Sequence, residues 1–463
     1  MNIKAGFSKA DLMEILPETK SCEMPLSAQG FYLSRSDDHS FFLVTDFMDF
    51  DLQAISHLKN AVAPGLPENT KIHIMTVHNH GGGTWDQLNI ERFSELALMC
   101  AKQSVANCRE VKIRAAQGVL DQKISIKRRI FVPEINGSFT CFYGVDSTAP
   151  GNASAFVDTA LKNLEQGLLT FTGSGTSDGD ERSFPDGDQQ FSILEFRSLD
   201  DVPLGSIVRF AAHAVCCNLP DCYSSDFPGY LREKLEKQLG GISIFMNGPC
   251  AEIAPAIRKK SPEEGKRIAK ILSDNILNRL EKEAFQPLNN FTDSLWEISL
   301  PVRKELIAPE CPAGSETVEN MDLNTVKQVL ESEYLQGNLP FLQKIYRNGV
   351  PLPDGKITVS TALLCLNEWN LLFFSGETFS ETAKKITDCF PQKKWVTITE
   401  HGRTAMYIPP EQEYLRGGYE PTCAVVAPEG EKELRQQMIL LLQEHFSKNN
   451  HTKKRYNKNE KLD

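Results

Sequence analysis

Two periodicities of apolar residues alternate along the chain, and their order predicts the fold class. Residues 39–51 form an apolar, β-branched and aromatic run typical of a buried strand, and residues 52–69 follow with helical spacing and a Pro/Gly turn. Residues 71–80 then form a second strand-like run, with three glycines directly after it. A strand, a helix and a strand in this order predict a βαβ unit.

The same two patterns predict the elements in the rest of the chain. Strand-like runs are expected at 190–196, 205–215, 242–248 and 362–377, and a hairpin that turns at Asn136–Gly137 is expected at 123–144. Helical spacing recurs at 90–108, 153–171, 227–241, 263–284 and 378–390. We therefore expect an α/β, or mixed α+β, fold in which helices flank central β-sheets.

Composition and charge exclude several classes of protein. The chain has 463 residues, with 50 Lys and Arg against 61 Asp and Glu, for a net charge of −11. This acidic balance argues against a general nucleic-acid binder. No apolar run approaches the roughly 20 residues that span a bilayer. The first residues also lack the apolar core of a secretion signal, so we expect a cytoplasmic protein.

Length and local composition predict one catalytic domain, residues 1–446, followed by a polar and basic tail, 447–463, which we expect to be disordered. The 12 cysteines are scattered, and the one tight cluster is Cys216, Cys217 and Cys222. This cluster lacks the second cysteine pair of a thiolate metal site, so we expect three free thiols.

The segment IMTVHNHGGGTWD, residues 74–86, allows two kinds of chemistry. HGGG, starting at His80, is typical of the oxyanion loop of a lipase-like esterase. HNH, starting at His78, is typical of two metal ligands or of a ligand and a catalytic partner. Residues i and i+2 of a strand point to one face, so His78 and His80 are expected to project together at the open end of the strand.

The esterase hypothesis needs a nucleophile, and GTSDG at 175–179 matches the G-x-S-x-G motif with Ser177 at its centre. A nucleophile elbow requires a helix immediately after the serine, but Pro185 and Gly187 follow here. A segment this rich in glycine and serine also produces the motif by chance. We therefore interpret Ser177 as a loop residue without a catalytic role.

The metal hypothesis gains support from two other strand ends. His213 ends the apolar strand predicted at 205–215, and Glu377 directly follows the strands predicted at 362–377. Two histidines and a carboxylate at strand ends suit a catalytic zinc ion that keeps one position open for water. The alternative is that these polar side chains lie at the start of a loop, form hydrogen bonds and have no catalytic or metal-binding role.

The segments that carry these residues, taken in order, resemble those of the neutral/alkaline ceramidase family, in its bacterial type. The matching segments are HNHGGG, RFAAH, SSDFPGY, NGPCAEIAP, SGETF and YIPPEQEYLRGGYE. They cover nearly the whole chain, from about residue 4 to 425, and their common order is more specific than any one of them. The resemblance implies a ceramidase-like catalytic domain with an inserted hairpin region at about 100–150.

The resemblance also implies roles for individual residues. His78, His213 and Glu377 match the zinc ligands, and His80 matches a group that faces the substrate carbonyl as oxyanion stabiliser or proton donor. Arg182 matches the active-site arginine of the family. Ser225 matches a serine that acts as nucleophile or as support for the site, and Tyr414 matches the tyrosine of an E-Y pair.

This sequence departs from the family pattern at several positions. Thr404 stands where the family has a tyrosine that is its fourth zinc ligand, so His401, Tyr407 or water could complete the site. Glu252 replaces an aspartate, and the chain ends before the immunoglobulin-like domain of the family. These departures affect the expected lipid substrate more than the expected metal chemistry.

Together these observations predict a zinc-dependent hydrolase, with one zinc ion per chain, that cleaves an N-acyl amide bond in a ceramide-like lipid or a related compound by metal-activated water. Glycines 81–83 would let substrate approach the metal. The alternatives are a metal-dependent esterase or amidase that acts on a non-lipid substrate, and a ceramidase-like binding protein that has lost catalysis.

Overall fold

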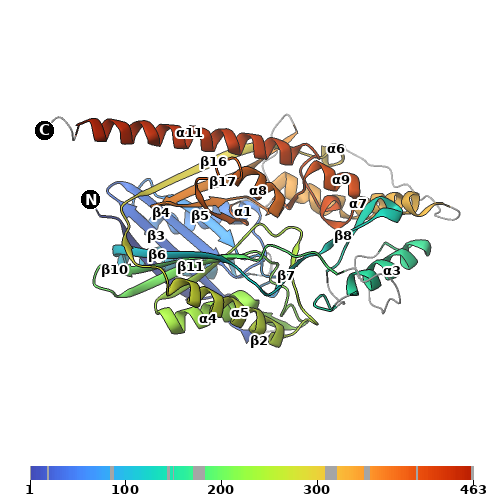
Figure 1. The fold of residues 1–463 in the computed structure, drawn as a ribbon, viewed down its shortest axis with the longest axis horizontal. Helices are drawn as coiled ribbons and strands as arrows, with labels where there is room; N and C mark the ends of the chain where they lie inside the picture. Colours follow the sequence, from blue (N-terminus) through green and yellow to red (C-terminus); the bar gives the residue numbers. More distant parts are fainter. Residues whose placement is uncertain are drawn as a thin grey trace.

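The structure, a computed structural model, describes residues 2–17, 20–83, 88–142, 146–149, 151–169, 183–307, 321–348, 355–402 and 405–459, with side chains up to Lys448. Ser177, Arg182 and Thr404 lie outside the described residues. The predicted fold class is confirmed, because β-sheets form the centre of the molecule and helices cover them (Figure 1).

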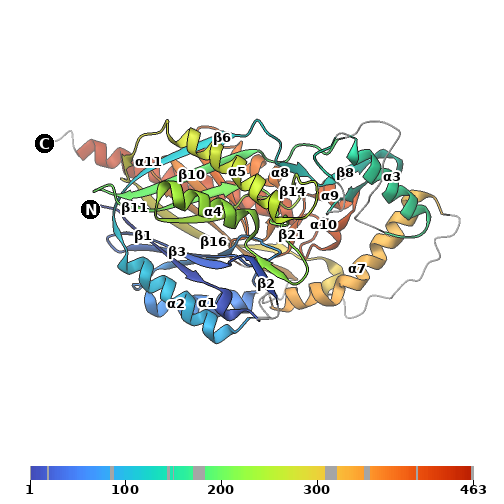
Figure 2. The same ribbon diagram turned by 90° about the horizontal axis from the view of Figure 1, so that it is seen from below.

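The large sheet has nine strands, eight of them in the order β13-β11-β10-β6-β1-β3-β4-β5, with β15 beside β6. Their bounds are β1 (Lys4–Asp11), β3 (Ser27–Arg35), β4 (Asp38–Thr45), β5 (Lys71–Thr76), β6 (Arg109–Val119), β10 (Gln190–Ser198), β11 (Pro203–Phe210), β13 (Ile242–Asn247) and β15 (Gln286–Pro287). Helices cover both of its halves: α1 (Leu52–Val62) and α2 (Ile90–Ala106) at one end, α4 (Asp226–Leu239) and α5 (Pro262–Leu280) at the other (Figure 2).

A second sheet of four strands packs between the large sheet and two further helices. It consists of β16 (Phe291–Pro301), β17 (Lys356–Leu366), β18 (Trp369–Phe373) and β20 (Lys394–Ile398). Alternate residues of β17 belong to two cores: Ala362 and Leu364 pack toward the large sheet, whereas Leu363 and Cys365 pack toward α8 (Ser380–Thr387) and α11 (Gly430–Asn459). This alternation with period two makes β17 apolar on both faces.

Among the described residues, four short strand pairs and five further α-helices lie outside the two sheets. The pairs are β2 (Ser21–Met24) with β12 (Cys222–Ser224), β7 (Ser125–Lys127) with β14 (Ile253–Pro255), β8 (Arg129–Val132) with β9 (Gly137–Thr140), and β19 (Glu377–Thr378) with β21 (Tyr407–Ile408). The remaining helices are α3 (Asn152–Glu165), α6 (Lys304–Ile307), α7 (Leu323–Asn348), α9 (Glu411–Arg416) and α10 (Tyr419–Thr422).

The predicted βαβ unit is confirmed, since β4 and β5 pair in parallel across α1. The predicted hairpin is also present as β8 and β9, and Asn136 makes the turn with a left-handed φ of 42°. At the carboxyl end, helix α11 extends to Asn459. It therefore crosses the boundary between domain and tail that was expected at residue 447. The domain limits stay a prediction.

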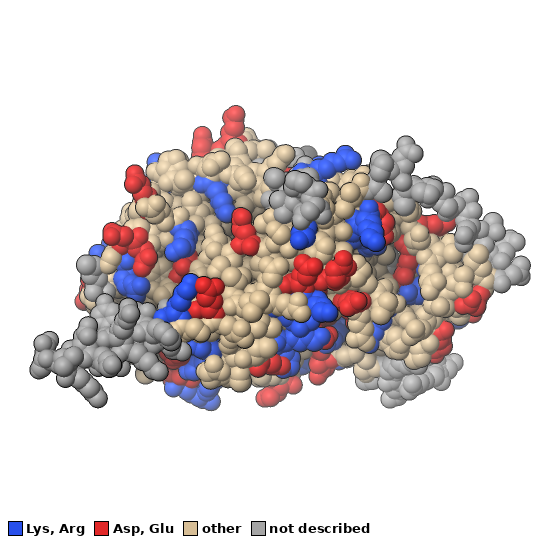
Figure 3. All heavy atoms as spheres, turned by 90° about the horizontal axis from the view of Figure 1, so that it is seen from above, with Lys and Arg blue, Asp and Glu red and all other residues tan. Residues whose placement is uncertain are grey.

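Two surface properties bear on possible partners. No helix in the described ranges is long and apolar enough to cross a membrane. On the face drawn in Figure 3, Lys and Arg side chains lie interspersed with Asp and Glu, and neither sign gathers into a continuous patch. This face therefore lacks the basic stripe that tracks a nucleic-acid backbone.

Candidate metal centre

The two histidines of the HNH segment lie in a loop and not on a strand. β5 ends at Thr76, and His78 has a left-handed φ of 55°, so the strand geometry assumed from the sequence does not hold. The two imidazoles meet nevertheless, with ring centroids 5.0 Å apart. The expectation that His78 and His80 project together is therefore correct, but its reason is a turn of the backbone.

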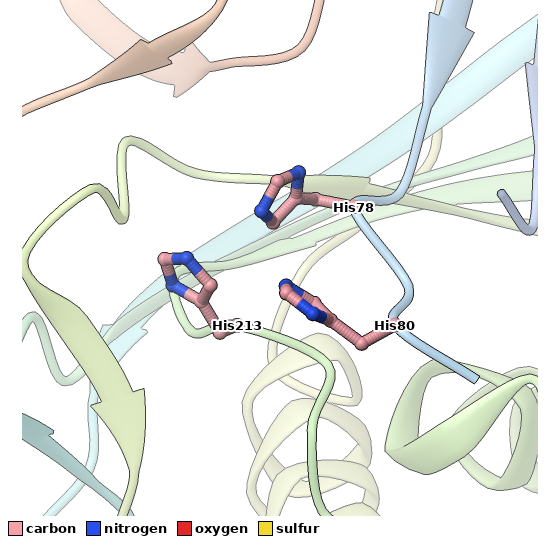
Figure 4. A group of neighbouring side chains, drawn as sticks. All are labelled: His78, His80 and His213. Atoms are coloured by element: carbon pink, nitrogen blue, oxygen red, sulfur yellow. The ribbon is translucent and has the colours of Figure 1, made fainter. Parts of the chain in front are cut away.

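His213 reaches the same point from the loop after β11. Asn79 and Ala214 form an isolated parallel bridge, which places the segments that follow β5 and β11 side by side. The side chains of His78, His80 and His213 point toward one another (Figure 4), and each offers a nitrogen within 4.8 Å of the other two. These three histidines form a group that could hold a metal ion.

Glu377 approaches two of these histidines from β19. Its Oε2 lies 3.0 Å from Nε2 of His213 and 3.4 Å from Nε2 of His78. Metal–ligand bonds of about 2.0–2.1 Å in a tetrahedral site put neighbouring ligand atoms about 3.3 Å apart. Glu377 thus contacts two of the three histidines through one carboxylate oxygen, at distances close to this spacing.

The hydrogen bonds of His213 fit a metal better than a proton. Its Nδ1 lies 2.9 Å from the Ile253 carbonyl oxygen and its Nε2 3.0 Å from Glu377, so two hydrogen bonds would require the imidazolium form. Burial and the Arg128 charge, however, lower the pKa of His213 to about 4. A neutral ring has one N–H, which the carbonyl oxygen accepts, and this leaves the Nε2 lone pair for a cation.

His78 and His80 each present a nitrogen that fits the same cation. The Nε2 atoms of both rings are buried and have no hydrogen-bond partner among the described residues. Nδ1 of His78 donates to the Met48 carbonyl oxygen at 3.2 Å, which again directs the lone pair to Nε2. Buried nitrogens without partners are costly unless something fills the space between them.

The carboxylates around His78 dominate its protonation. Burial alone would lower the pKa of His78, but Glu377 and Glu400 outweigh this effect and raise it to about 9. Burial would raise the pKa of Glu377, but its histidine partners hold it well below its usual range. In the metal-free protein His78 is therefore protonated at pH 7, and its positive charge faces the Glu377 carboxylate.

His80 differs from His78 in its electrostatic surroundings. Burial of its ring, and then the charges of His78 and His213, hold the pKa of His80 well below its usual range. His80 is therefore neutral near pH 7. A neutral imidazole can either bind a metal or exchange a proton with a substrate.

Glu400 is a site residue that sequence reasoning missed. It follows β20, is 5% exposed, and its Oε1 lies 3.8 Å from Nδ1 of His78. Burial and then the Glu377 charge raise its pKa to about 8. A signal was available, because Glu400 follows an apolar strand in the same way as Glu377 does.

Arg128 was also missed as a site residue, although it lies in the predicted hairpin region. Its guanidinium is buried, forms an ion pair with Glu420 at 2.9 Å, and donates to the Ala251 carbonyl oxygen and to the Tyr407 hydroxyl at 2.8 and 3.0 Å. Its positive charge acts on both His80 and His213. Tyr407, paired with Glu377 between β21 and β19, lies beside the centre.

Glycines 81 and 82 make room for the protein's own backbone. A Cβ at Gly81 would lie 2.6 Å from the Ser224 carbonyl oxygen, and one at Gly82 would overlap the Asp46 carbonyl oxygen. Asn79, between the two histidines, donates to these same two oxygens at 2.8 and 3.0 Å. Close backbone packing, more than access for substrate, therefore requires the glycines.

Asp46, whose backbone supports this loop, is held by a buried ion pair. Its two carboxylate oxygens accept hydrogen bonds from Nη1 and Nη2 of Arg232, each at 2.6 Å. The backbone N–H of Ser27 also donates to Asp46, at 2.7 Å. The loop that carries His78 and His80 therefore rests on a bidentate ion pair, the strongest geometry for such a contact.

Ser225 lies at the start of α4, next to the glycine loop. Its hydroxyl is buried, has no hydrogen-bond partner among the described residues, and sits against Gly229, where a Cβ would overlap it. A serine nucleophile needs a base within hydrogen-bond reach. The geometry therefore favours support of the site over nucleophilic attack.

Two other predicted residues have hydrogen-bond partners outside the histidine group. The Tyr414 hydroxyl donates to the Val426 carbonyl oxygen at 2.7 Å, which gives it a local structural bond. Nε2 of His401 lies 2.8 Å from Nδ1 of His73, so this nitrogen has its partner outside the histidine group. Of the residues considered for a fourth ligand, Tyr407 pairs through its backbone with Glu377, whereas His401 contacts His73.

The cysteine cluster has the predicted state. Cys216 and Cys217 are buried, Cys222 is half-buried, and all three are unpaired. Burial raises the pKa of the Cys217 thiol, followed by the Asp226 charge. The Cys216 and Cys217 thiols are therefore protonated and inert near neutral pH.

Comparisons with known proteins place the fold. No profile of a known protein family and no curated protein matches the sequence. The structure of neutral ceramidase from Pseudomonas aeruginosa is similar with a TM-score of 0.62, at 14% identity over 95% of this chain and 74% of that chain. A ceramidase complexed with C2 gives 0.61, at 15% identity over 96% and 76%. At such low identity, the similarity establishes a ceramidase-like fold.

Proposed function

We propose that this protein is a zinc-dependent hydrolase that cleaves the amide bond of an N-acyl substrate, either a ceramide-like lipid or a related compound. The observation that carries the proposal is the convergence of His78, His80 and His213, whose ring nitrogens lie within 4.8 Å of one another. The buried Nε2 atoms of His78 and His80 have no hydrogen-bond partner among the described residues, and Glu377 brings a carboxylate to His78 and His213. The ceramidase-like fold supports an amide as the bond that is cleaved.

His78, His213 and Glu377 are the proposed ligands. Two neutral nitrogens and one carboxylate form a donor set that is common for catalytic zinc. When bound, zinc would polarise the substrate carbonyl and make a water molecule nucleophilic near neutral pH. The second carboxylate, Glu400, and the Met48 carbonyl oxygen hold the far side of the His78 ring.

Side chains of the protein transfer the proton of the attacking water and stabilise the negative charge of the intermediate. His80 is neutral at pH 7, so it accepts the proton of the attacking water and returns it to the amine that leaves. Arg128 supplies a fixed positive charge to the site, which would stabilise the negative oxygen of the tetrahedral intermediate; the family resemblance had matched Arg182, not Arg128, to the active-site arginine. Ser225 supports the loop from α4.

The test is hydrolysis by zinc-loaded protein of matched N-acyl amides and esters that have the same acyl chain. Amide cleavage by the wild-type protein, lost by at least about 100-fold in His80→Ala with zinc still bound, supports the proposal. Asp293→Asn is the control, because Asp293 is a buried carboxylate that bonds to His73 and not to the centre. Cleavage of esters alone would favour an esterase, and cleavage of neither would favour a binding protein.

A further inference from the structure

We propose that Glu400 is a positioning residue for His78: its carboxylate orients the imidazole so that Nε2 is presented to the metal ion. This inference rests on the proposed metal site but not on the reaction catalysed there. Glu400 is buried at 5% exposure, and its Oε1 is 3.8 Å from Nδ1 of His78. That oxygen has no hydrogen-bond partner among the described residues.

His78 is held between two carboxylates. Glu377 lies 3.4 Å from its Nε2, and Glu400 lies 3.8 Å from its Nδ1, on the opposite edge of the ring. The Met48 carbonyl oxygen also faces Nδ1, at 3.2 Å. The Met48 carbonyl oxygen accepts the hydrogen of Nδ1, and a neutral ring then keeps its lone pair at Nε2; Glu400 lies in contact on this same side of the ring. Carboxylates that fix a metal-binding histidine in this way also make it a stronger ligand.

The backbone brings Glu400 to this position at a cost. Glu400 has a φ of 60° and His78 a φ of 55°, so both ends of the contact adopt the left-handed conformation that non-glycine residues avoid. Hydrogen bonds from Thr76 N–H to the Glu400 carbonyl oxygen, and from Thr399 N–H to that of Asn247, hold the turn. Residues with a strained backbone conformation occur most often at functional sites. The strain at both His78 and Glu400 therefore supports a functional role for this contact.

The experiment compares the zinc affinity of the wild-type protein, Glu400→Gln and Asp293→Asn by competition with a chromophoric chelator at fixed pH. Loss of an outer carboxylate typically weakens metal binding by about 10–100-fold, so Glu400→Gln is expected to lose affinity in that range. Asp293→Asn removes a buried carboxylate 2.8 Å from Nε2 of another histidine, His73, and is expected to bind zinc as the wild type does.

The outcomes separate this inference from the proposed function. Unchanged affinity in Glu400→Gln, or an equal loss in Asp293→Asn, would overturn the positioning role while the metal site stands. Failure of the wild-type protein to bind zinc would overturn the proposed function and this inference together. If Glu400→Gln does not fold, Glu400→Asp serves instead: it keeps the charge on a shorter side chain, so an intermediate loss is expected, and an unchanged affinity would again overturn the inference.

Discussion

Raising the pH should strengthen zinc binding, because zinc must displace the proton of His78. The pKa of His78 is about 9 in the metal-free protein, so only about one molecule in 100 has the free ring at pH 7. His213, with a pKa of about 4, and Glu377 are already deprotonated there. Zinc affinity is therefore expected to rise about tenfold per pH unit well below pH 9, and by about 50-fold from pH 7 to 9. Glu400, with a pKa of about 8, also ionises between pH 7 and 9, and its negative charge near His78 is expected to raise the zinc affinity as well.

The stability of the zinc-free protein should change in the opposite sense. The folded-state pKa of His78 lies above the ordinary value of 6.5, so its stabilising effect is complete below pH 6.5 and is lost as the pH rises through 9. A shift of this size corresponds to about 3 kcal/mol. Chelator competition with buffered zinc measures the affinity, and thermal unfolding of the metal-free protein measures the stability. An affinity that changes by less than about threefold between pH 7 and 9 would refute the reasoning.

Three further predictions concern the loop and its supports. Gly82→Ala should destabilise the protein by about 1–3 kcal/mol in thermal unfolding, because its Cβ would overlap the Asp46 carbonyl oxygen, whereas Gly337→Ala, in open space on α7, should be neutral or slightly stabilising. Arg232→Met should cost about 3–5 kcal/mol in denaturant unfolding, since it leaves the buried Asp46 carboxylate unpaired. Ser225→Ala should leave stability within about 0.5 kcal/mol and retain amide hydrolysis; complete loss of turnover would restore Ser225 as the nucleophile.

Apolar periodicity made most of the fold predictable. The parallel β4–α1–β5 unit and the β8–β9 hairpin follow directly from the spacing of buried residues and from one turn. His78, His213 and Glu377 were predictable as candidates because each is a polar residue after an apolar strand. Their convergence could not be derived from local pattern, since it depends on how the segments beyond β5, β11 and β18 approach one another.

The residues that the sequence did not reveal are those whose partners lie far away along the chain. In the sequence, Arg128 is one of two adjacent arginines in the predicted hairpin region, and nothing nearby marks it as a site residue. Its partner Glu420 is nearly three hundred residues later, and that pairing makes its burial favourable. Glu400 was not predictable from the sequence as a neighbour of His78, because His78 lies in the loop after β5, a strand of the other sheet. The glycines were predicted to give access to substrate, which stays a prediction; their contacts with the Ser224 and Asp46 carbonyl oxygens could not be predicted, since these oxygens come from β12 and from the residue after β4.

The most direct test of the account is X-ray absorption and anomalous diffraction at the zinc edge, on crystals of the protein loaded with one equivalent of zinc. The account predicts a single zinc ion about 2.0–2.2 Å from Nε2 of His78, Nε2 of His213 and a carboxylate oxygen of Glu377. Zinc bound at any other place, or no ordered zinc at these three side chains, would contradict it.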